Sequence, residues 1–265
     1  MEAADPSQPA GGAPKRGLFA RLFGRARFEA LIPAGQRVYA VGDIHGRLDL
    51  FERLLGKIAA DNARRPPADV ELILLGDVID RGPDSAALVD RLRAGVEGFD
   101  AVTVLRGNHE QAMLQGLAGD LGMFETWLGN GGTEALASWG VPGPILYGED
   151  IPPLLDAARE IVPAGVLPWI AALPLSRHIG DYYFVHAGVR PGVPLAEQQE
   201  SDQLWIRQGF LDSDEDHGAV IVHGHTIKPR VQQRGNRIGI DTGAWRTGRL
   251  TALGLEGDRR WVLTG

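Results

Sequence analysis

From residue 37 to about residue 117, the sequence alternates three times between a short apolar run, a turn containing glycine and apolar residues at helical spacing. The apolar runs lie at residues 38–41, 70–75 and 101–105, and their β-branched residues favour strands. Three successive strand–helix units imply right-handed crossovers and a largely parallel sheet with helices on both faces. The sequence therefore predicts an α/β fold.

The alternation stops between about residues 113 and 173, a segment that contains three tryptophans, a glycine pair and a proline-rich run. We expect a mostly helical insertion there, lying over the sheet. Strand-like runs follow at residues 182–185, 219–222 and 237–240, and residues 250–255 and 260–263 predict a terminal hairpin. A length of 265 residues suits one α/β domain, which we place at residues 31–265.

Residues 1–30 are expected to form a flexible basic tail. The first 14 are mostly Ala, Pro, Gly and Ser without periodicity, whereas residues 15–32 place apolar side chains among arginines and favour an amphipathic helix. Such a helix suits an anionic membrane surface or a protein partner. The tail lacks the apolar core of a signal peptide, and we expect a cytoplasmic protein without stable membrane insertion.

Composition limits the chemistry. The chain contains no cysteine, which excludes a cysteine nucleophile and a thiolate metal site, so any metal must be held by oxygen and nitrogen. The formal net charge of −7 argues against general binding of nucleic acid phosphates.

Polar motifs stand at the end of each predicted strand. In chain order they read VGDIHG, LGDVIDRG, RGNHE, VHAG and VHGHT, and they contain five of the seven histidines. Because ligands bind at the carboxyl ends of strands in open α/β sheets, we expect these motifs to converge. Their oxygen and imidazole donors suit divalent Mn, Fe or Zn. The candidate ligands are Asp43, His45, Asp77, Asn108, His186 and His225.

The ordered motif set resembles the calcineurin-type metallophosphoesterases, and within them the phosphoprotein phosphatase family of Ser/Thr phosphatases in its compact bacterial and phage form. The resemblance spans about residues 38–243. It implies mixed β-sheets packed as a sandwich and flanked by helices. It also implies two divalent ions, Mn first among them, with Asp43 and His45 on one ion, Asp77 bridging, and Asn108, His186 and His225 on the other. A hydroxide between the ions would attack phosphorus.

The same resemblance assigns the remaining catalytic roles. His109 would be the general acid that protonates the leaving oxygen, and Asp80 would orient its imidazole. Arg81 and Arg207 would bind phosphate oxygens, since guanidinium groups donate in pairs to tetrahedral oxyanions. His223 is expected to lie around the ligands or to pack in the sheet, and Asp241 to be a loop carboxylate that supports the site, with a direct role left open. Ile227 occupies the position where many related nucleases and phosphodiesterases carry a further histidine ligand, which counts against those activities.

Three functions remain open. The main expectation is a Ser/Thr protein phosphatase that acts on a phosphorylated protein or peptide. The alternative is a symmetrical bis(5'-nucleosyl)-tetraphosphatase, a family that typically carries alanine at the position of Asp80 and aspartate at that of Glu110. The third is a non-catalytic metal-binding scaffold, and the presence of His109 and Asp77 argues against it.

Overall fold

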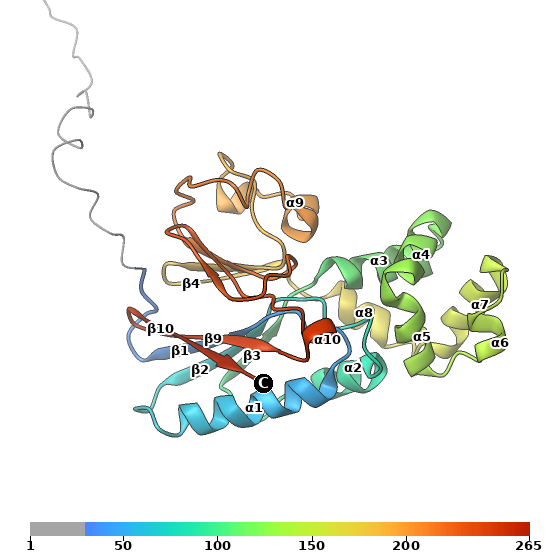
Figure 1. Cartoon of the computed structure of the whole chain (residues 1–265), viewed down its shortest axis with the longest axis horizontal. Helices are drawn as coiled ribbons and strands as arrows, with labels where there is room; N and C mark the ends of the chain where they lie inside the picture. Colours follow the sequence, from blue (N-terminus) through green and yellow to red (C-terminus); the bar gives the residue numbers. More distant parts are fainter. Residues whose placement is uncertain (1–29) are drawn as a thin grey trace, which may run out of the picture.

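The computed structural model describes residues 30–265 and contains two five-stranded sheets packed face to face (Figure 1). In the first sheet three parallel strands carry an antiparallel hairpin at one edge. Its strand order is β10 (Arg259–Thr264), β9 (Thr251–Glu256), β1 (Gln36–Val41), β2 (Asp69–Leu74) and β3 (Ala101–Val104). Val41 pairs with Leu74, and Leu74 with Val104, so the parallel strands end at one level.

The second sheet also has three parallel strands at its centre. Its order is β4 (Ser176–Ile179), β5 (Tyr182–Val185), β6 (Val220–His223), β8 (Arg237–Gly239) and β7 (Gln232–Gln233). Val38 and Ala40 of β1 pack against Phe184 and Val222 in the core between the sheets, whereas Tyr39 points to the helical side. This alternation follows from the two-residue period of a strand. The predicted α/β sandwich is confirmed.

Helices cover the outer face of the first sheet and extend beyond its end (Figure 1). Those on the outer face are α1 (Leu48–Asn62) and α2 (Ser85–Ala94). The segment from residue 108 to 171 is helical, as expected, and comprises α3 (Asn108–Ala118), α4 (Leu121–Trp127), a π-helical turn (Leu128–Gly132), α5 (Thr133–Trp139), α6 (Gly143–Leu146), α7 (Ile151–Ile161) and α8 (Val166–Ala171). The insertion was expected to lie over the sheet. Helices α4 to α7 instead lie beside the sheets, where α5 packs on α2.

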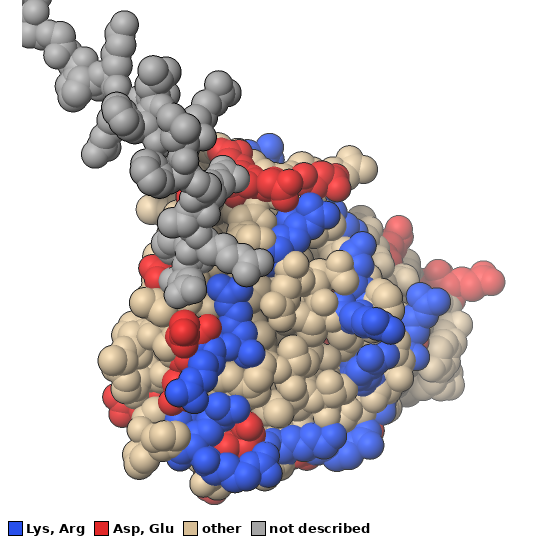
Figure 2. All heavy atoms as spheres, turned by 60° about the vertical axis from the view of Figure 1, so that its left-hand side comes forward, with Lys and Arg blue, Asp and Glu red and all other residues tan. Residues whose placement is uncertain are grey.

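Short helices complete the chain: a 3-10 turn (Leu195–Glu197), α9 (Glu200–Trp205) and α10 (Ala244–Thr247). The predicted amphipathic segment lies almost entirely outside the described residues. Within residues 30–265, every helix is too short or too polar to cross a membrane. On the face shown in Figure 2, Lys and Arg side chains gather in a band, so the net negative charge does not describe every face.

Candidate active site

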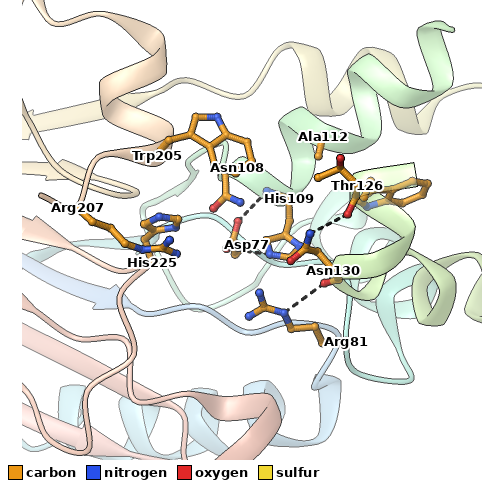
Figure 3. Close-up of a pocket in the computed structure, with 11 residues that line it drawn as sticks. Asp77, Arg81, Asn108, His109, Ala112, Thr126, Asn130, Trp205, Arg207 and His225 are labelled. Carbon is orange, nitrogen blue, oxygen red and sulfur yellow. Dashed lines mark hydrogen bonds and ion pairs between the residues drawn. The ribbon is translucent and has the colours of Figure 1, made fainter. Parts of the chain in front are cut away.

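The predicted motifs meet at the carboxyl ends of the parallel strands, around a cavity of about 120 Å³ (Figure 3). The loops after β2 and β6, one from each sheet, and helices α3 and α4 contribute to its walls. The lining residues are Asp77, Arg81, Asn108, His109, Ala112, Thr126, Trp127, Asn130, Trp205, Arg207 and His225. The cavity is therefore built where a doubly wound sheet is expected to bind ligands.

Backbone strain is concentrated in the same motifs. Within residues 30–265, five residues other than glycine have a positive φ: His45 (50°), Asp77 (48°), Asp80 (75°), Arg81 (66°) and His225 (61°). A left-handed backbone is costly for residues with a Cβ atom and clusters at functional sites. Each of the five is a predicted site residue, so the strain and the motifs point to one site.

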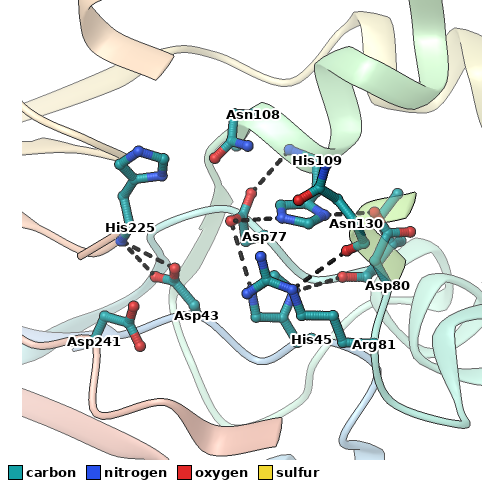
Figure 4. Close-up of polar contacts among 12 residues, drawn as sticks. Asp43, His45, Asp77, Asp80, Arg81, Asn108, His109, Asn130, His225 and Asp241 are labelled. Carbon is teal, nitrogen blue, oxygen red and sulfur yellow. Dashed lines mark hydrogen bonds and ion pairs between the residues drawn. The ribbon is translucent and has the colours of Figure 1, made fainter. Parts of the chain in front are cut away.

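Asp77 lies at the centre of two groups of potential metal ligands (Figure 4). On one side, its Oδ2 is 3.7 Å from His45 Nε2 and 3.8 Å from His109 Nε2. On the other side, its Oδ1 is 3.4 Å from His186 Nε2, and His225 completes the group. Donor atoms in each group lie within 4.8 Å of one another. This arrangement makes Asp77 the one residue shared by both groups.

The contacts of His186 favour a cation. Its Nδ1 lies 2.9 Å from the carbonyl oxygen of Leu75 and must donate a hydrogen to it, which leaves Nε2 with a lone pair. Yet Nε2 is 2.8 Å from Asn108 Oδ1, another acceptor, and 3.2 Å from His225 Nδ1. The lone pairs of His186 Nε2 and Asn108 Oδ1 face each other and repel, and a divalent cation between them removes the conflict. The donor set therefore fits a metal.

Burial keeps the candidate ligands in the form that binds metals. It lowers the pKa of His186, lowers that of His45 well below its usual value, and lowers that of His225 to about 2. Neutral imidazole is the form that coordinates a divalent ion. The second nitrogen of His225, Nε2, is buried and has no hydrogen-bond partner among the described residues.

Asp43 stands apart from both groups. Its carboxylate accepts hydrogen bonds from the backbone N–H of His225 at 2.9 and 3.1 Å, and it lies beside Asp241 (Figure 4). Burial, and then the charge of Asp241, raise the pKa of Asp43 well above its usual value. Burial likewise raises the pKa of Asp241 to about 6. Two adjacent buried carboxylates favour a cation nearby, so a metal role for Asp43 stays a prediction.

His109 is held by a buried carboxylate. Its Nδ1 lies 2.6 Å from Asp80 Oδ2, and Asp80 is fully buried. Burial alone would lower the pKa of His109, but the carboxylates of Asp77 and Asp80 outweigh it and raise the pKa. His109 Nε2 is then the proton-carrying atom directed at Asp77. This geometry is the one expected for a general acid and its orienting carboxylate.

Trp127 is a site residue that the sequence analysis did not identify. Its Nε1 donates to Asp80 Oδ2 at 2.8 Å, and the indole is fully buried at the end of α4. The helical insertion thereby fixes the carboxylate that orients His109. Nothing in the sequence distinguishes Trp127 from the other tryptophans of the insertion.

Replacing Trp127 with Phe is expected to lower kcat by roughly tenfold, in the range found for outer partners that orient site residues. The free energy of unfolding should fall by about 2 kcal/mol, because a hydrogen bond to a charged group is lost. Steady-state kinetics and urea denaturation measure the two effects. Replacing the half-buried Trp169 with Phe is the matched control, and equal kcat losses in both variants would contradict the role of Trp127.

The two predicted phosphate-binding arginines lie on opposite sides of the cavity (Figure 3). Arg81 Nε donates to the carbonyl oxygen of Asn130 at 3.3 Å, and its NH1 lies 2.9 Å from His45 Nε2. If His45 Nε2 holds a metal, the guanidinium is released to bind phosphate oxygens. Gly131 allows the Arg81 segment to pack this closely, since a Cβ atom at residue 131 would lie 2.6 Å from both the backbone nitrogen and Cγ of Arg81. Arg207 follows α9 and lines the opposite wall.

Glu110 fixes the loop that carries Asp77. Its buried carboxylate accepts hydrogen bonds from the backbone N–H groups of Asp77 and Val78 at 2.9 Å each, of Ile79 at 3.2 Å and of Gly107 at 2.8 Å. From the sequence, Glu110 was expected only to distinguish two families, not to hold a loop of the site. Its place three residues after Gly107, at the start of α3, was the available signal, because glutamate at that position accepts a hydrogen bond from the N-cap backbone N–H.

Comparisons with known proteins show which family this chain resembles. The family model described as calcineurin-like phosphoesterase matches residues 36–246. A serine/threonine-protein phosphatase 1 of Salmonella typhimurium is 31% identical over 232 residues, which are 83% of this chain and 93% of that protein. A symmetrical bis(5'-nucleosyl)-tetraphosphatase of Nitrosomonas europaea is 31% identical over 161 residues, or 61% of this chain.

The match spans only about half of that tetraphosphatase, 48% of its length. Among solved structures, a proposed diadenosine tetraphosphatase has a TM-score of 0.60 at 21% identity and covers 89% of this chain and 96% of its own. At that identity the likeness concerns the fold alone. The family model, by contrast, covers most of the chain, including all five motifs. The chain therefore belongs to the calcineurin-like phosphoesterase family.

Proposed function

We propose that this protein is a metal-dependent phosphoester hydrolase that removes phosphate from phosphorylated serine or threonine side chains. The observation that carries the proposal is the buried pair formed by His109 and Asp80 at the cavity wall. A serine or threonine alkoxide is a poor leaving group and needs a proton as the bond to phosphorus breaks. A histidine held by a buried carboxylate supplies that proton.

Each side chain has a distinct task in this mechanism. When bound, divalent ions would polarise the phosphoryl group and activate water for attack. Arg81 and Arg207 bind phosphoryl oxygens from opposite sides of the cavity. His109 donates its Nε2 proton to the leaving oxygen, while Asp80 fixes the tautomer through Nδ1. Trp127 and Glu110 hold Asp80 and the Asp77 loop in place.

The match to the Salmonella serine/threonine-protein phosphatase supports this substrate class, because it extends over 93% of that protein. The comparisons support the second candidate, a symmetrical bis(5'-nucleosyl)-tetraphosphatase, at least as well. Several such relatives are 29–33% identical to this chain over the matched residues. A nucleotide phosphate leaves as a stable anion, so that reaction depends less on a general acid.

We expect the manganese-loaded protein to hydrolyse a phosphoserine peptide with a higher kcat/KM than diadenosine tetraphosphate. Replacing Asp80 with Ala should then lower kcat on the peptide by roughly 10²-fold, within the usual contribution of a general acid. Its effect on the nucleotide should be smaller, because that leaving group needs no proton. Metal-stripped protein reconstituted in parallel with Mn, Fe, Zn or Mg provides the metal control.

The hydrolysis rates on the two substrates together decide between the two candidate functions. Faster cleavage of diadenosine tetraphosphate by the unaltered protein, with little loss on Asp80→Ala, would replace the proposed function by the second candidate. Absence of hydrolysis with every metal and both substrates would leave the binding scaffold as the remaining function.

A further inference from the structure

A second cavity, of about 230 Å³, lies beside the candidate active site, and Arg207 lines both. The loop after β6 runs between them: His225 lines the first cavity, and Thr226 lines the second. We call the second cavity the arginine pocket and define it by Arg207, His223, Thr226, Lys228, Arg234 and Arg237. Its position next to the reaction centre makes it accessible to another part of the same substrate.

The arginine pocket is strongly cationic. Arg207, Lys228, Arg234 and Arg237 line it, against a single carboxylate, that of Asp212. Of these cations, only Arg234 has an ion-pair partner within residues 30–265, the exposed Asp214 at 3.4 Å. The excess positive charge inside a chain of net charge −7 favours an anionic ligand.

Arg237 is the most informative of these cations because it is 6% exposed. Its guanidinium donates to the carbonyl oxygens of Ser213, at 3.2 Å, and of Leu211. No carboxylate of the described chain lies within ion-pair distance of it. A buried charge without a counter-charge is unfavourable, and an anion in the pocket would supply that counter-charge.

Two polar atoms of the pocket are buried without a hydrogen-bond partner: His223 Nε2 and Thr226 Oγ1. His223 Nδ1 lies 3.1 Å from the carbonyl oxygen of Gly224 and donates to it, so Nε2 is an acceptor. Gly239 keeps this atom open, because a Cβ atom there would lie 3.0 Å from Nε2. The pocket thus offers cations for an anion and an acceptor for a hydroxyl or N–H group.

We propose that the arginine pocket binds a second phosphoryl group of the substrate while the first reacts at the candidate active site. A hydroxyl or N–H group next to the second phosphate donates to His223 Nε2, and Arg207 contacts both phosphates. This inference rests on the proposed phosphoester hydrolysis. A nucleoside polyphosphate and a peptide with two phosphoserines both present this chemistry, and the experiment separates them.

The test compares substrates that carry one phosphate with substrates that carry more. The double variant Lys228→Met, Arg234→Gln should raise KM about tenfold on diadenosine tetraphosphate, on a doubly phosphorylated peptide, or on both. Neither kcat nor KM on p-nitrophenyl phosphate should change. Gly239→Ala keeps every charge and should raise the same KM values by crowding His223. The substrate that responds identifies the source of the second phosphate.

The control double variant Arg53→Gln, Arg64→Gln removes one cation from α1 and one from the turn that follows it, whose side chains are 60% and 74% exposed, and should leave all constants unchanged. Equal losses on p-nitrophenyl phosphate, or unchanged KM values on both larger substrates, would overturn the inference. If the unaltered protein hydrolyses none of these compounds, the proposed function fails. Calorimetric titration with tripolyphosphate then tests the pocket alone: weaker binding in the Lys228 and Arg234 double variant supports it, and unchanged binding refutes it.

Discussion

Replacing Asp77 with Asn should reduce phosphoester hydrolysis by more than about 10³-fold, a larger loss than the 10–100-fold typical of outer partners of a metal site. Asp77 is shared by both groups of potential ligands, so one substitution weakens both. Asparagine retains the shape and one oxygen, and can still accept from the backbone N–H of His109, now 3.1 Å from Oδ1. The effect is therefore attributable to the lost charge.

Metal analysis and thermal denaturation measure this effect independently of activity. A metal that binds only the folded state raises Tm, and the rise should vanish or shrink in Asp77→Asn because the affinity falls. Asp156→Asn is the matched control, since this side chain on α7 is 80% exposed and far from the motifs. Full metal content together with unchanged turnover in Asp77→Asn would contradict a shared role for this carboxylate.

The position of the site could be predicted from the sequence because it depends on local order. Polar motifs directly after predicted strands must lie at one end of a parallel sheet, and the structure places Asp77, Asn108 and His186 there. The central strands were also predictable, within two residues, from their apolar runs. By contrast β4 and β7 were not predicted, because their residues are mostly polar and exposed at the sheet edge.

The residues that hold the site in place could not be predicted, because they act through contacts between segments that are distant in the sequence. Trp127 reaches Asp80 across 47 residues, and Glu110 binds backbone groups more than 30 residues away. Asp241 follows a strand of the second sheet and approaches Asp43 only because the two sheets pack face to face. Such contacts have no periodicity in one sequence, and neither has the arginine pocket, whose cations come from three loops and strand β8.

The structure is compatible with two roles for His109, and a single substitution can separate them. It lies in a potential metal group with His45 and Asp77, and it also contacts Asp80 as a general acid would. His109→Asn should lower kcat on a phosphoserine peptide by about 10²- to 10⁴-fold, the usual contribution of a positioned acid. The loss on p-nitrophenyl phosphate should be smaller, because its phenolate leaves without a proton.

Metal content decides between the two roles. If His109 is the acid, His109→Asn keeps the full metal content, and its loss of activity is larger for the substrate with the more basic leaving group. If His109 is a ligand, metal content falls and both substrates are affected equally, which would remove it from the proton-transfer step. His178→Asn, on the exposed edge strand β4, is the matched control and should change neither quantity. Because Asp80 contacts His109 Nδ1 and Trp127 donates to Asp80, the same larger loss on the peptide in Asp80→Ala and in Trp127→Phe would show that the three residues act as one unit.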